Sequence, residues 1–162
     1  MYPVHPAPRT AILVPWFHRG LRTQRSLRVF PHGWNREVEG FMPGSIAGTI
    51  EQLSALADVA APFLTHSVIV LWRPSQPRLT EACRDSLWAA FHVPVFEQVI
   101  GKSGELLAAE CEAHDGLHVV APFSHGENES LDDSLCPCGR KAPRIGVAQG
   151  AALERRVASY AR

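Results

Sequence analysis

The hydrophobic pattern along the chain predicts short helices and strands, because 13 prolines and 12 glycines interrupt it. The run SVIVLW, residues 67–72, is continuous and rich in β-branched residues, which is typical of a strand covered on both faces. The apolar runs at residues 93–100, 105–112 and 116–121 predict three more strands. Glycine turns join the last two of these runs, as expected for a hairpin or meander.

Two segments have apolar residues at helical spacing. The first covers about residues 45–61, where Thr49 and Gln52 have the form of a capping box. The second begins after Thr80, a good N-cap residue, and places Glu81 in the first turn, where the helix dipole favours a negative charge. Five residues are expected to form the buried stripe of this second helix: Leu79, Cys83, Leu87, Trp88 and Phe91.

The remaining segments are shorter or less regular. Residues 11–16, AILVPW, predict a short buried strand, and LRVF at residues 27–30 is a further strand candidate. The rest of residues 17–44 is turn-rich and supports no clear prediction. Residues 124–134 are polar and acidic and predict an exposed loop. Residues 147–162 read as a C-terminal helix of modest amphipathicity.

These elements predict one domain over residues 1–162 with a mixed α/β (α+β) fold. Within it we expect a β-α-β unit at residues 67–100, a β-rich zinc-binding subdomain at residues 101–146 and the C-terminal helix at 147–162. The chain is 46% hydrophobic and 20% charged, which is a globular composition.

The charge balance and the lack of targeting signals exclude several classes of protein. Sixteen basic and sixteen acidic residues leave no formal net charge, so a nucleic-acid partner is not expected. No run approaches the roughly 20 apolar residues needed to span a bilayer, so no membrane partner is expected. The N-terminus lacks the features of a secretory signal, which predicts a cytoplasmic protein with reduced thiols. The oligomeric state is not indicated.

Cysteine and histidine gather in two short stretches, ECEAHDGLHVV at residues 110–120 and LCPCGRKAPRI at residues 135–145. Zinc prefers tetrahedral sets of thiolate and imidazole ligands. Four residues would supply such a set from two turns: Cys111, His118, Cys136 and Cys138. His114 is the rival for the imidazole position. The alternative is that these are incidental thiols, since cysteine is often a small buried apolar residue, as we expect for Cys83.

A full set of four ligands favours a structural zinc site over a catalytic one. Catalytic zinc typically has three protein ligands and an open position for water. The polar loop that precedes Cys136 has little to bury, so a metal would hold it in place. Structural zinc contributes about 10–16 kcal/mol of apparent binding free energy in small peptides, comparable to the stability of a whole domain.

The two stretches ECEAHDGLHV and CPCGRKAPRI resemble the later part of the large N-terminal domain of phenylacetate–coenzyme A ligase-like proteins. These enzymes belong to the adenylate-forming, acyl-activating superfamily. The resemblance covers about residues 67–146 and, loosely, residues 1–66. It implies that this chain is a fragment-like portion of the adenylate-forming N-terminal domain. Family members with zinc hold it by an early cysteine, a histidine and a later Cys-x-Cys pair, which correspond to Cys111, His118, Cys136 and Cys138.

The resemblance fails at the residues that perform the family's chemistry. The family activates a carboxylic acid with ATP and magnesium and then transfers the acyl group to coenzyme A. VFEQVIGKSGE, residues 95–105, lies at the place of its aromatic-Gly-x-Thr/Ser-Glu motif but does not keep the pattern. No counterpart of the lysine on the family's mobile C-terminal lid is found. We therefore expect structural zinc without ATP or magnesium, in a catalytically inactive relative that binds an acyl or aromatic acid or a ligase partner.

Two other functions compete with this interpretation. In the first, the chain is an active ligase, alone or completed by another chain, in which Arg140 and Arg144 hold phosphate and Glu97 or Glu105 holds magnesium. The simpler interpretation of the two arginines is a pair of exposed basic residues after the metal turn. In the second, the chain is a zinc-containing protein-interaction module, for which exposed aromatic residues such as Trp34 would serve the partner. The alternative for Trp34 is a half-buried position over the irregular N-terminal segment.

Overall fold

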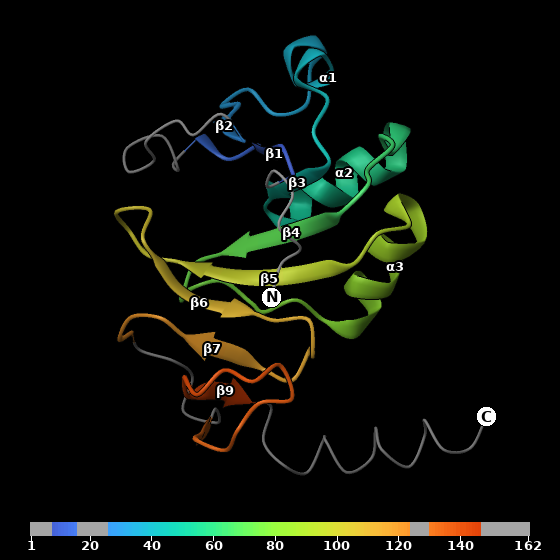
Figure 1. The fold of residues 1–162 in the computed structure, drawn as a ribbon. Helices are drawn as coiled ribbons and strands as arrows, with labels where there is room; N and C mark the ends of the chain where they lie inside the picture. The colour runs from blue at the N-terminus through green and yellow to red at the C-terminus, as the bar shows by residue number, and fades with distance from the viewer. Residues whose placement is uncertain (1–7, 16–25, 124–129, 147–162) are drawn as a thin grey trace, which may run out of the picture.

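A nine-stranded sheet runs through the residues that the structure describes, which are 8–15, 26–123 and 130–146 of a computed structural model. The strand order is β2-β1-β3-β4-β5-β6-β7-β9-β8. Figure 1 shows the sheet from β1 and β2 at one edge to β9 near the other. The predicted mixed α/β fold is confirmed. The predicted C-terminal helix at residues 147–162 lies outside the described residues.

The helices and strands are short, as the spacing of proline and glycine predicts. The strands are β1 (Thr10–Ile12), β2 (Leu27–Val29), β3 (Ser45–Gly48), β4 (Ser67–Trp72), β5 (Val95–Ile100), β6 (Leu106–Glu110), β7 (Leu117–Val119), β8 (Ser130–Asp132) and β9 (Arg144–Gly146). The helices are α1 (Arg36–Phe41), α2 (Ile50–Ala60) and α3 (Glu81–Phe91). No helix of the described residues is long and apolar enough to cross a membrane.

Strands β1 to β5 form a parallel half of the sheet, and α2 and α3 pack on one face of it. Side chains alternate between the two faces of a strand, so Val68 and Val70 point toward the helices while Ile69 and Leu71 point away. The helix-side cluster includes Leu53 of α2 and Leu87 of α3. The other face carries a second buried cluster: Ile12, Val14, Ala47, Leu71 and Ile100.

Strands β6 to β9 form an antiparallel half. β5 and β6 pair as a hairpin with an irregularity in register between Val99 and Ile100, and β6 then pairs with β7. β9 pairs with β7 on one side and β8 on the other. Figure 1 shows α2 and α3 beside β4 and β5, away from β7 and β9. The apolar core here is small and centres on Val99, Leu107, Ala108 and Leu117 together with Trp72.

The N-terminal caps predicted at Thr49 and Thr80 both form, at the starts of α2 and α3. The Thr49 side chain accepts a hydrogen bond from the N–H of Gln52 at 3.3 Å, and the Gln52 side chain accepts one from the N–H of Thr49 at 3.1 Å. The Thr80 hydroxyl likewise accepts from the N–H of Cys83 at 3.3 Å. The predicted start of the first helix at residue 45 is wrong, because Ser45–Gly48 is fully buried strand β3, paired on both sides.

Four further differences from the sequence prediction concern exposure and short elements. Trp88, expected in the buried stripe of α3, is 58% exposed. Apart from the strand candidate at residues 27–30, which forms β2, residues 17–44 supported no prediction, yet they contain α1, whose N-cap Asn35 accepts a hydrogen bond from Glu37 at 2.8 Å. The loop predicted at residues 124–134 contains β8, and β9 was not predicted. These elements have 3 to 6 residues, too few to give a periodic signal.

Candidate metal centre

The four predicted ligands meet at one point of the antiparallel half. One ligand atom from each of Cys111, His118, Cys136 and Cys138 lies within 4.8 Å of all the others. The Sγ atoms of Cys111 and Cys136 are 3.7 Å apart, and Sγ of Cys138 is 3.4 Å from Nε2 of His118. Tetrahedral zinc with ordinary bond lengths places two sulfurs about 3.8 Å apart and a sulfur and a nitrogen about 3.6 Å apart. These two distances fit that geometry.

The hairpin of β6 and β7 positions the first two residues of the cluster. Cys111 follows the last residue of β6, and His118 lies in β7 opposite Ala109. The turn between them is tight: the N–H of His114 donates to the carbonyl of Cys111 at 3.0 Å. Gly116 has φ +85° and passes so close to β9 that an added Cβ would lie 2.8 Å from the carbonyl oxygen of Ile145. A glycine is therefore required at position 116, where the turn passes close to β9.

The CPCG turn positions the other two residues. The N–H of Gly139 donates to the carbonyl of Cys136 at 2.8 Å, and Gly139 adopts a φ of +83°, which a residue with a side chain rarely does. The Cys138 thiol accepts a hydrogen bond from the backbone N–H of Arg140, and the Cys111 thiol accepts one from that of Ala113. Both turns thus aim an N–H at a sulfur, which stabilises the thiolate form that binds metal.

The imidazole of His118 is oriented by a backbone carbonyl. Nδ1 lies 3.1 Å from the carbonyl oxygen of Ala142, which can only accept, so Nδ1 carries the proton and donates. Nε2 is then the unprotonated nitrogen, and it points to the cysteines. Metal-binding histidines commonly have such a partner on their second nitrogen. His118 is only 2% exposed, so this arrangement is sheltered from water.

Burial changes the acidity of the thiols in the absence of a metal. Burial raises the pKa of Cys111 to about 11, and the neighbouring thiols of Cys138 and Cys136 add to the rise. The pKa of Cys138 lies below its ordinary value. Burial acts to raise it, but hydrogen bonds from the N–H of Arg140 and from the two other cysteines outweigh that effect. Three buried or half-buried thiols around an imidazole are a donor set suited to zinc, which would hold all three as thiolates.

His114, the rival for the imidazole position, lies outside the cluster. Its Nδ1 is 2.9 Å from Oε1 of Glu110, and its ring stacks on Phe96 with centroids 4.9 Å apart. Glu110 also accepts two hydrogen bonds of 3.1 Å from the guanidinium of Arg84 on α3. His114 therefore belongs to a polar network that ties the β6–β7 turn to α3.

The two carboxylates considered for magnesium already have protein partners. Glu97 is 4% exposed, accepts a hydrogen bond of 3.0 Å from Nε1 of Trp72, and lies 3.4 Å from Nη2 of Arg84. Burial raises the pKa of Glu97 against the opposing effect of Arg78. The exposed carboxylate of Glu105 lies against the turn between β5 and β6, where it accepts a hydrogen bond of 2.9 Å from the N–H of Ser103.

Arg144 is buried, so its interpretation as an exposed basic residue is wrong; Arg140 is exposed as expected. The guanidinium of Arg144 bonds to the carboxylate of Asp115, to the Asp132 carboxylate at 2.5 Å and to Oγ of Ser134 at 2.8 Å. It therefore joins β9 to the β6–β7 turn and to the segment after β8. The sequence does contain the two parts of this contact, the acidic segment at residues 124–134 and Arg144 itself. Nothing in the hydrophobic pattern indicated that they pair.

The arrangement as a whole fits a closed, structural metal site. Four protein donors fill a tetrahedron, so the cluster provides no protein-free position at which a metal would activate water. The donors come from the β6–β7 hairpin and from the turn before β9. A metal bound here would fasten these two pieces of the antiparallel half together.

The comparisons with known proteins found a likeness of fold and no match to a protein family. No family model matches the chain, and no curated protein matches it. A solved structure of 2-hydroxyisobutyryl-CoA ligase, in an open conformation in complex with 2-HIB-AMP and CoA, is similar to it with a TM-score of 0.59 and 13% sequence identity. The match covers 88% of this chain and 44% of that one, so the chain spans less than half the length of that ligase. The fold of the nine-stranded sheet therefore resembles that of part of this ligase.

Proposed function

We propose that this chain is a zinc-binding, catalytically inactive relative of the AMP-forming acyl- and aryl-CoA ligases. In this proposal Cys111, His118, Cys136 and Cys138 hold a structural zinc ion that fastens the antiparallel half. The chain then acts by binding an acyl or aromatic acid or a ligase partner, without forming an acyl adenylate itself.

The single observation that carries the proposal is the convergence of the four donor atoms within 4.8 Å of one another. The N–H groups aimed at two of the sulfurs and the carbonyl that orients His118 support it, because they prepare the donors for a cation. The fold likeness to an acyl-CoA ligase supports the kinship.

The engagement of the candidate catalytic residues supports inactivity. Glu97 accepts a hydrogen bond from Trp72 and lies beside Arg84 inside the protein, so a magnesium ion at this carboxylate would have to displace both contacts. Arg144 has its guanidinium in contact with Asp115 and Asp132, so it offers no free fork to a phosphate group. An adenylating enzyme needs both kinds of contact with its nucleotide.

The first test measures the metal. The full chain, purified without chelator, is expected to contain about one zinc per chain, as measured by mass spectrometry of the metal. Cys138→Ser should reduce this content strongly, because one thiolate ligand is lost. Cys83→Ser is the matched control: Cys83 lies on α3 outside the cluster, and the substitution should leave zinc content unchanged. A metal-free wild-type chain with the same fold would overturn the zinc proposal.

The second test measures adenylation. The zinc-loaded chain is incubated with ATP, magnesium and a panel of aryl and alkyl acids, and ATP–pyrophosphate exchange is followed. We expect no exchange above that of a chain-free control. Robust exchange with any acid would refute inactivity and favour the active-ligase alternative, and loss of that exchange in Glu97→Gln would assign the residue.

A further inference from the structure

A groove of about 560 Å³ lies at the amino-terminal edge of the parallel strands. Ligands of open α/β folds usually bind at the opposite, carboxyl-terminal edge. The floor forms where the chain enters β1, β3 and β4. There the N–H of Gly44 donates to the carbonyl of Arg9, and the N–H of His66 donates to the carbonyl of Gly44, each at 2.9 Å. These backbone bonds fix the floor in place.

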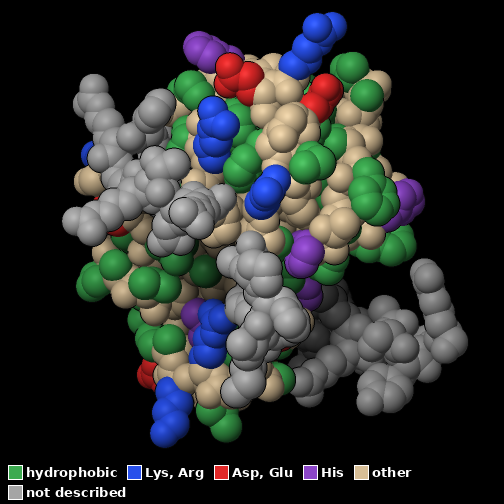
Figure 2. Space-filling model, turned by 45° about the horizontal axis from the view of Figure 1, so that its top comes forward, with side chains coloured by type: hydrophobic (Ala, Val, Ile, Leu, Met, Phe, Trp, Pro, Cys, Tyr) green, Lys and Arg blue, Asp and Glu red, His purple; other side chains and the backbone are tan. Residues whose placement is uncertain are grey.

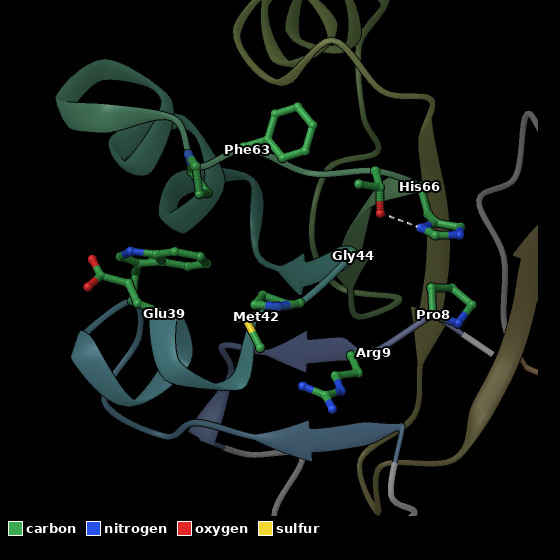
Figure 3. Close-up of a pocket in the computed structure, with 11 residues that line it drawn as sticks. Pro8, Arg9, Glu39, Met42, Gly44, Phe63 and His66 are labelled. Atoms are coloured by element: carbon green, nitrogen blue, oxygen red, sulfur yellow. Dashed lines mark hydrogen bonds between the residues drawn. The ribbon is translucent and has the colours of Figure 1, made fainter. Parts of the chain in front are cut away.

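Two helix ends supply apolar walls to this groove. Figure 3 shows Phe63, which follows α2, on one side and Met42, at the end of α1, on the other. Phe63 is 89% exposed and Met42 is 71% exposed, although Leu64, next to Phe63, is 3% exposed and belongs to the core. Trp34 completes the walls. Large apolar side chains gathered and exposed in this way are typical of a binding surface.

Polar side chains lie at both ends of the groove, and those of Arg9 and Glu39 are charged. Arg9 and His66 lie toward one end and Glu39 toward the other (Figure 3). The Arg9 guanidinium is fixed, because Nη1 donates to the carbonyl of Phe41 at 3.0 Å and the guanidinium lies 5.8 Å from the Phe41 ring centroid. The groove therefore offers a positioned cation beside an apolar wall.

The lack of a side chain at Gly44 leaves room for the His66 imidazole at the basic end of the groove. A Cβ added to Gly44 would lie 2.8 Å from Nδ1 of His66 and 2.8 Å from the hydroxyl oxygen of Thr65. These two side-chain atoms are themselves 2.6 Å apart, a hydrogen bond that sets the position of the imidazole over the floor. Any larger residue at this position would displace the imidazole from the groove.

We propose that this groove binds a peptide segment of a partner protein in which an aromatic anchor is followed by acidic residues. The anchor would lie between Phe63 and Met42, and the acidic side chains would face Arg9 and His66. The charges favour this placement of the acidic side chains. Arg9 and His66 can both pair with an acid, whereas the other end of the groove carries the carboxylate of Glu39. Charge complementarity of this kind sets specificity and orientation more than raw affinity.

The exposure of the walls favours a peptide over a small molecule. Small-ligand sites typically enclose about 70–90% of their ligand, whereas Phe63 and Met42 are themselves largely in water. Val59, on the last turn of α2, is a further apolar side chain with 85% exposure. Figure 2 shows hydrophobic side chains interspersed with charged ones on the face in view.

The test uses three capped octapeptides and the ¹⁵N-labelled, zinc-loaded full chain. The first peptide has a central tryptophan followed by two aspartates; the second has lysines for the aspartates; the third has alanine for the tryptophan. We expect the first to shift the Trp34 indole and Gly44 amide signals and to bind at least about tenfold tighter than either other peptide. Phe63→Ser and Arg9→Gln should each weaken it at least about fivefold.

Matched controls keep the result specific. Trp88→Ser removes an exposed aromatic residue from α3, outside the groove, and should not change the affinity. Equal binding of the aspartate and lysine peptides, or shifts confined to other surfaces, would overturn the proposal. So would tighter binding of 3-phenylpropionate, which would assign a small acid, or self-association through these residues in sedimentation, which would assign a second copy. None of these outcomes bears on the zinc site, which is in the other half of the sheet.

Discussion

The two halves of the sheet are held by different interactions. In the parallel half, β1 to β5 pack beneath helices, and the core contains fully buried side chains such as Leu53, Val68 and Leu87. In the antiparallel half, Leu117 and Ile145 are buried, but the turns between strands are joined by polar contacts, those of the Cys/His cluster and of Arg144. The first half is stabilised mainly by apolar burial and the second by a few directed contacts.

This difference follows from the amount of apolar surface that each half can bury. A parallel sheet needs a layer of helices, and the helices bring apolar side chains with them. Strands β7, β8 and β9 have 3 residues each, so they contribute few side chains to a core. Small units of this kind are commonly stabilised by metals or other cross-links. Metal removal should therefore affect the two halves differently: it should destabilise the antiparallel half and leave the parallel half folded.

The largest effect is expected from loss of the metal. Chelation of zinc, or Cys136→Ser, should lower the stability of the antiparallel half by more than about 5 kcal/mol, because zinc binding and the folding of a small metal site are coupled. Hydrogen exchange measures this: amides in β7 and β9 should lose protection while those in β3 and β4 keep it. Unchanged protection of β7 after chelation would contradict the comparison, and Cys83→Ser serves as control.

The second effect concerns the parallel half. Leu53 has 0% exposure, and Leu53→Ala should lower the free energy of unfolding by about 2–5 kcal/mol, since it removes apolar contacts and leaves a cavity. Denaturant unfolding of the zinc-loaded chain measures it. Val59→Ala on the same helix, at a position 85% exposed, should change stability by less than about 0.5 kcal/mol. A large loss of bound zinc in Leu53→Ala would show that the halves are coupled.

The third effect tests the contacts of Arg144. Arg144→Ala should cost about 1.5–3 kcal/mol, because hydrogen bonds to the charged carboxylates of Asp115 and Asp132 are lost. Arg144→Lys should recover only part of this, since an ammonium lacks the planar fork that reaches both acids. Thermal unfolding and exchange of the β9 amides measure it. Arg140→Ala, at an exposed position, is the control; an equal loss there would contradict the assignment.

The same contrast explains what could be predicted from the sequence. Strand β4 agreed to the residue, because a continuous β-branched run is a strong signal, and α3 begins after its predicted N-cap Thr80. Strand β3 was mistaken for the start of a helix, since Ser45–Gly48 is too short to distinguish the two periods and its pairing with β1 and β4 is non-local. Short elements depend on tertiary contacts.

The candidate site was predictable for a different reason. Metal ligands are few, chemically distinctive and held in turns whose glycines appear in the sequence, so Cys136, Cys138 and Cys111 could be grouped before any fold was known. The choice between His118 and His114 needed the structure, because it depends on which ring lies beside the thiols: His118 does, whereas His114 contacts Glu110. The role of Arg144 also needed it, since its partners lie in two separate segments.

The smallest effect is a pH dependence within the antiparallel half. Hydrogen bonds to Ser134, and then the guanidinium of Arg144, hold the pKa of Asp132 below its usual value. A carboxyl group whose pKa is lower in the folded state contributes stability above its unfolded pKa of about 3.9, and loses it as the pH falls through the folded value. The stability difference between wild type and Asp132→Asn should thus be constant from neutral pH to about pH 5 and shrink below about pH 4.

Zinc would also dissociate in acid, so the measurement must isolate the carboxyl group. A carbon-detected NMR titration of the zinc-loaded chain follows the Asp132 carboxyl signal directly and should give a midpoint below that of an unfolded peptide. In Arg144→Lys the midpoint should rise only slightly, because the hydrogen bonds to Ser134, the larger cause of the lowered pKa, remain. Asp133→Asn, which removes the same charge from the next residue, should leave the Asp132 midpoint nearly unchanged. A midpoint at or above the peptide value would mean that Asp132 lacks its contacts with Ser134 and Arg144 in solution, which would leave Asp115 as the carboxylate partner of Arg144.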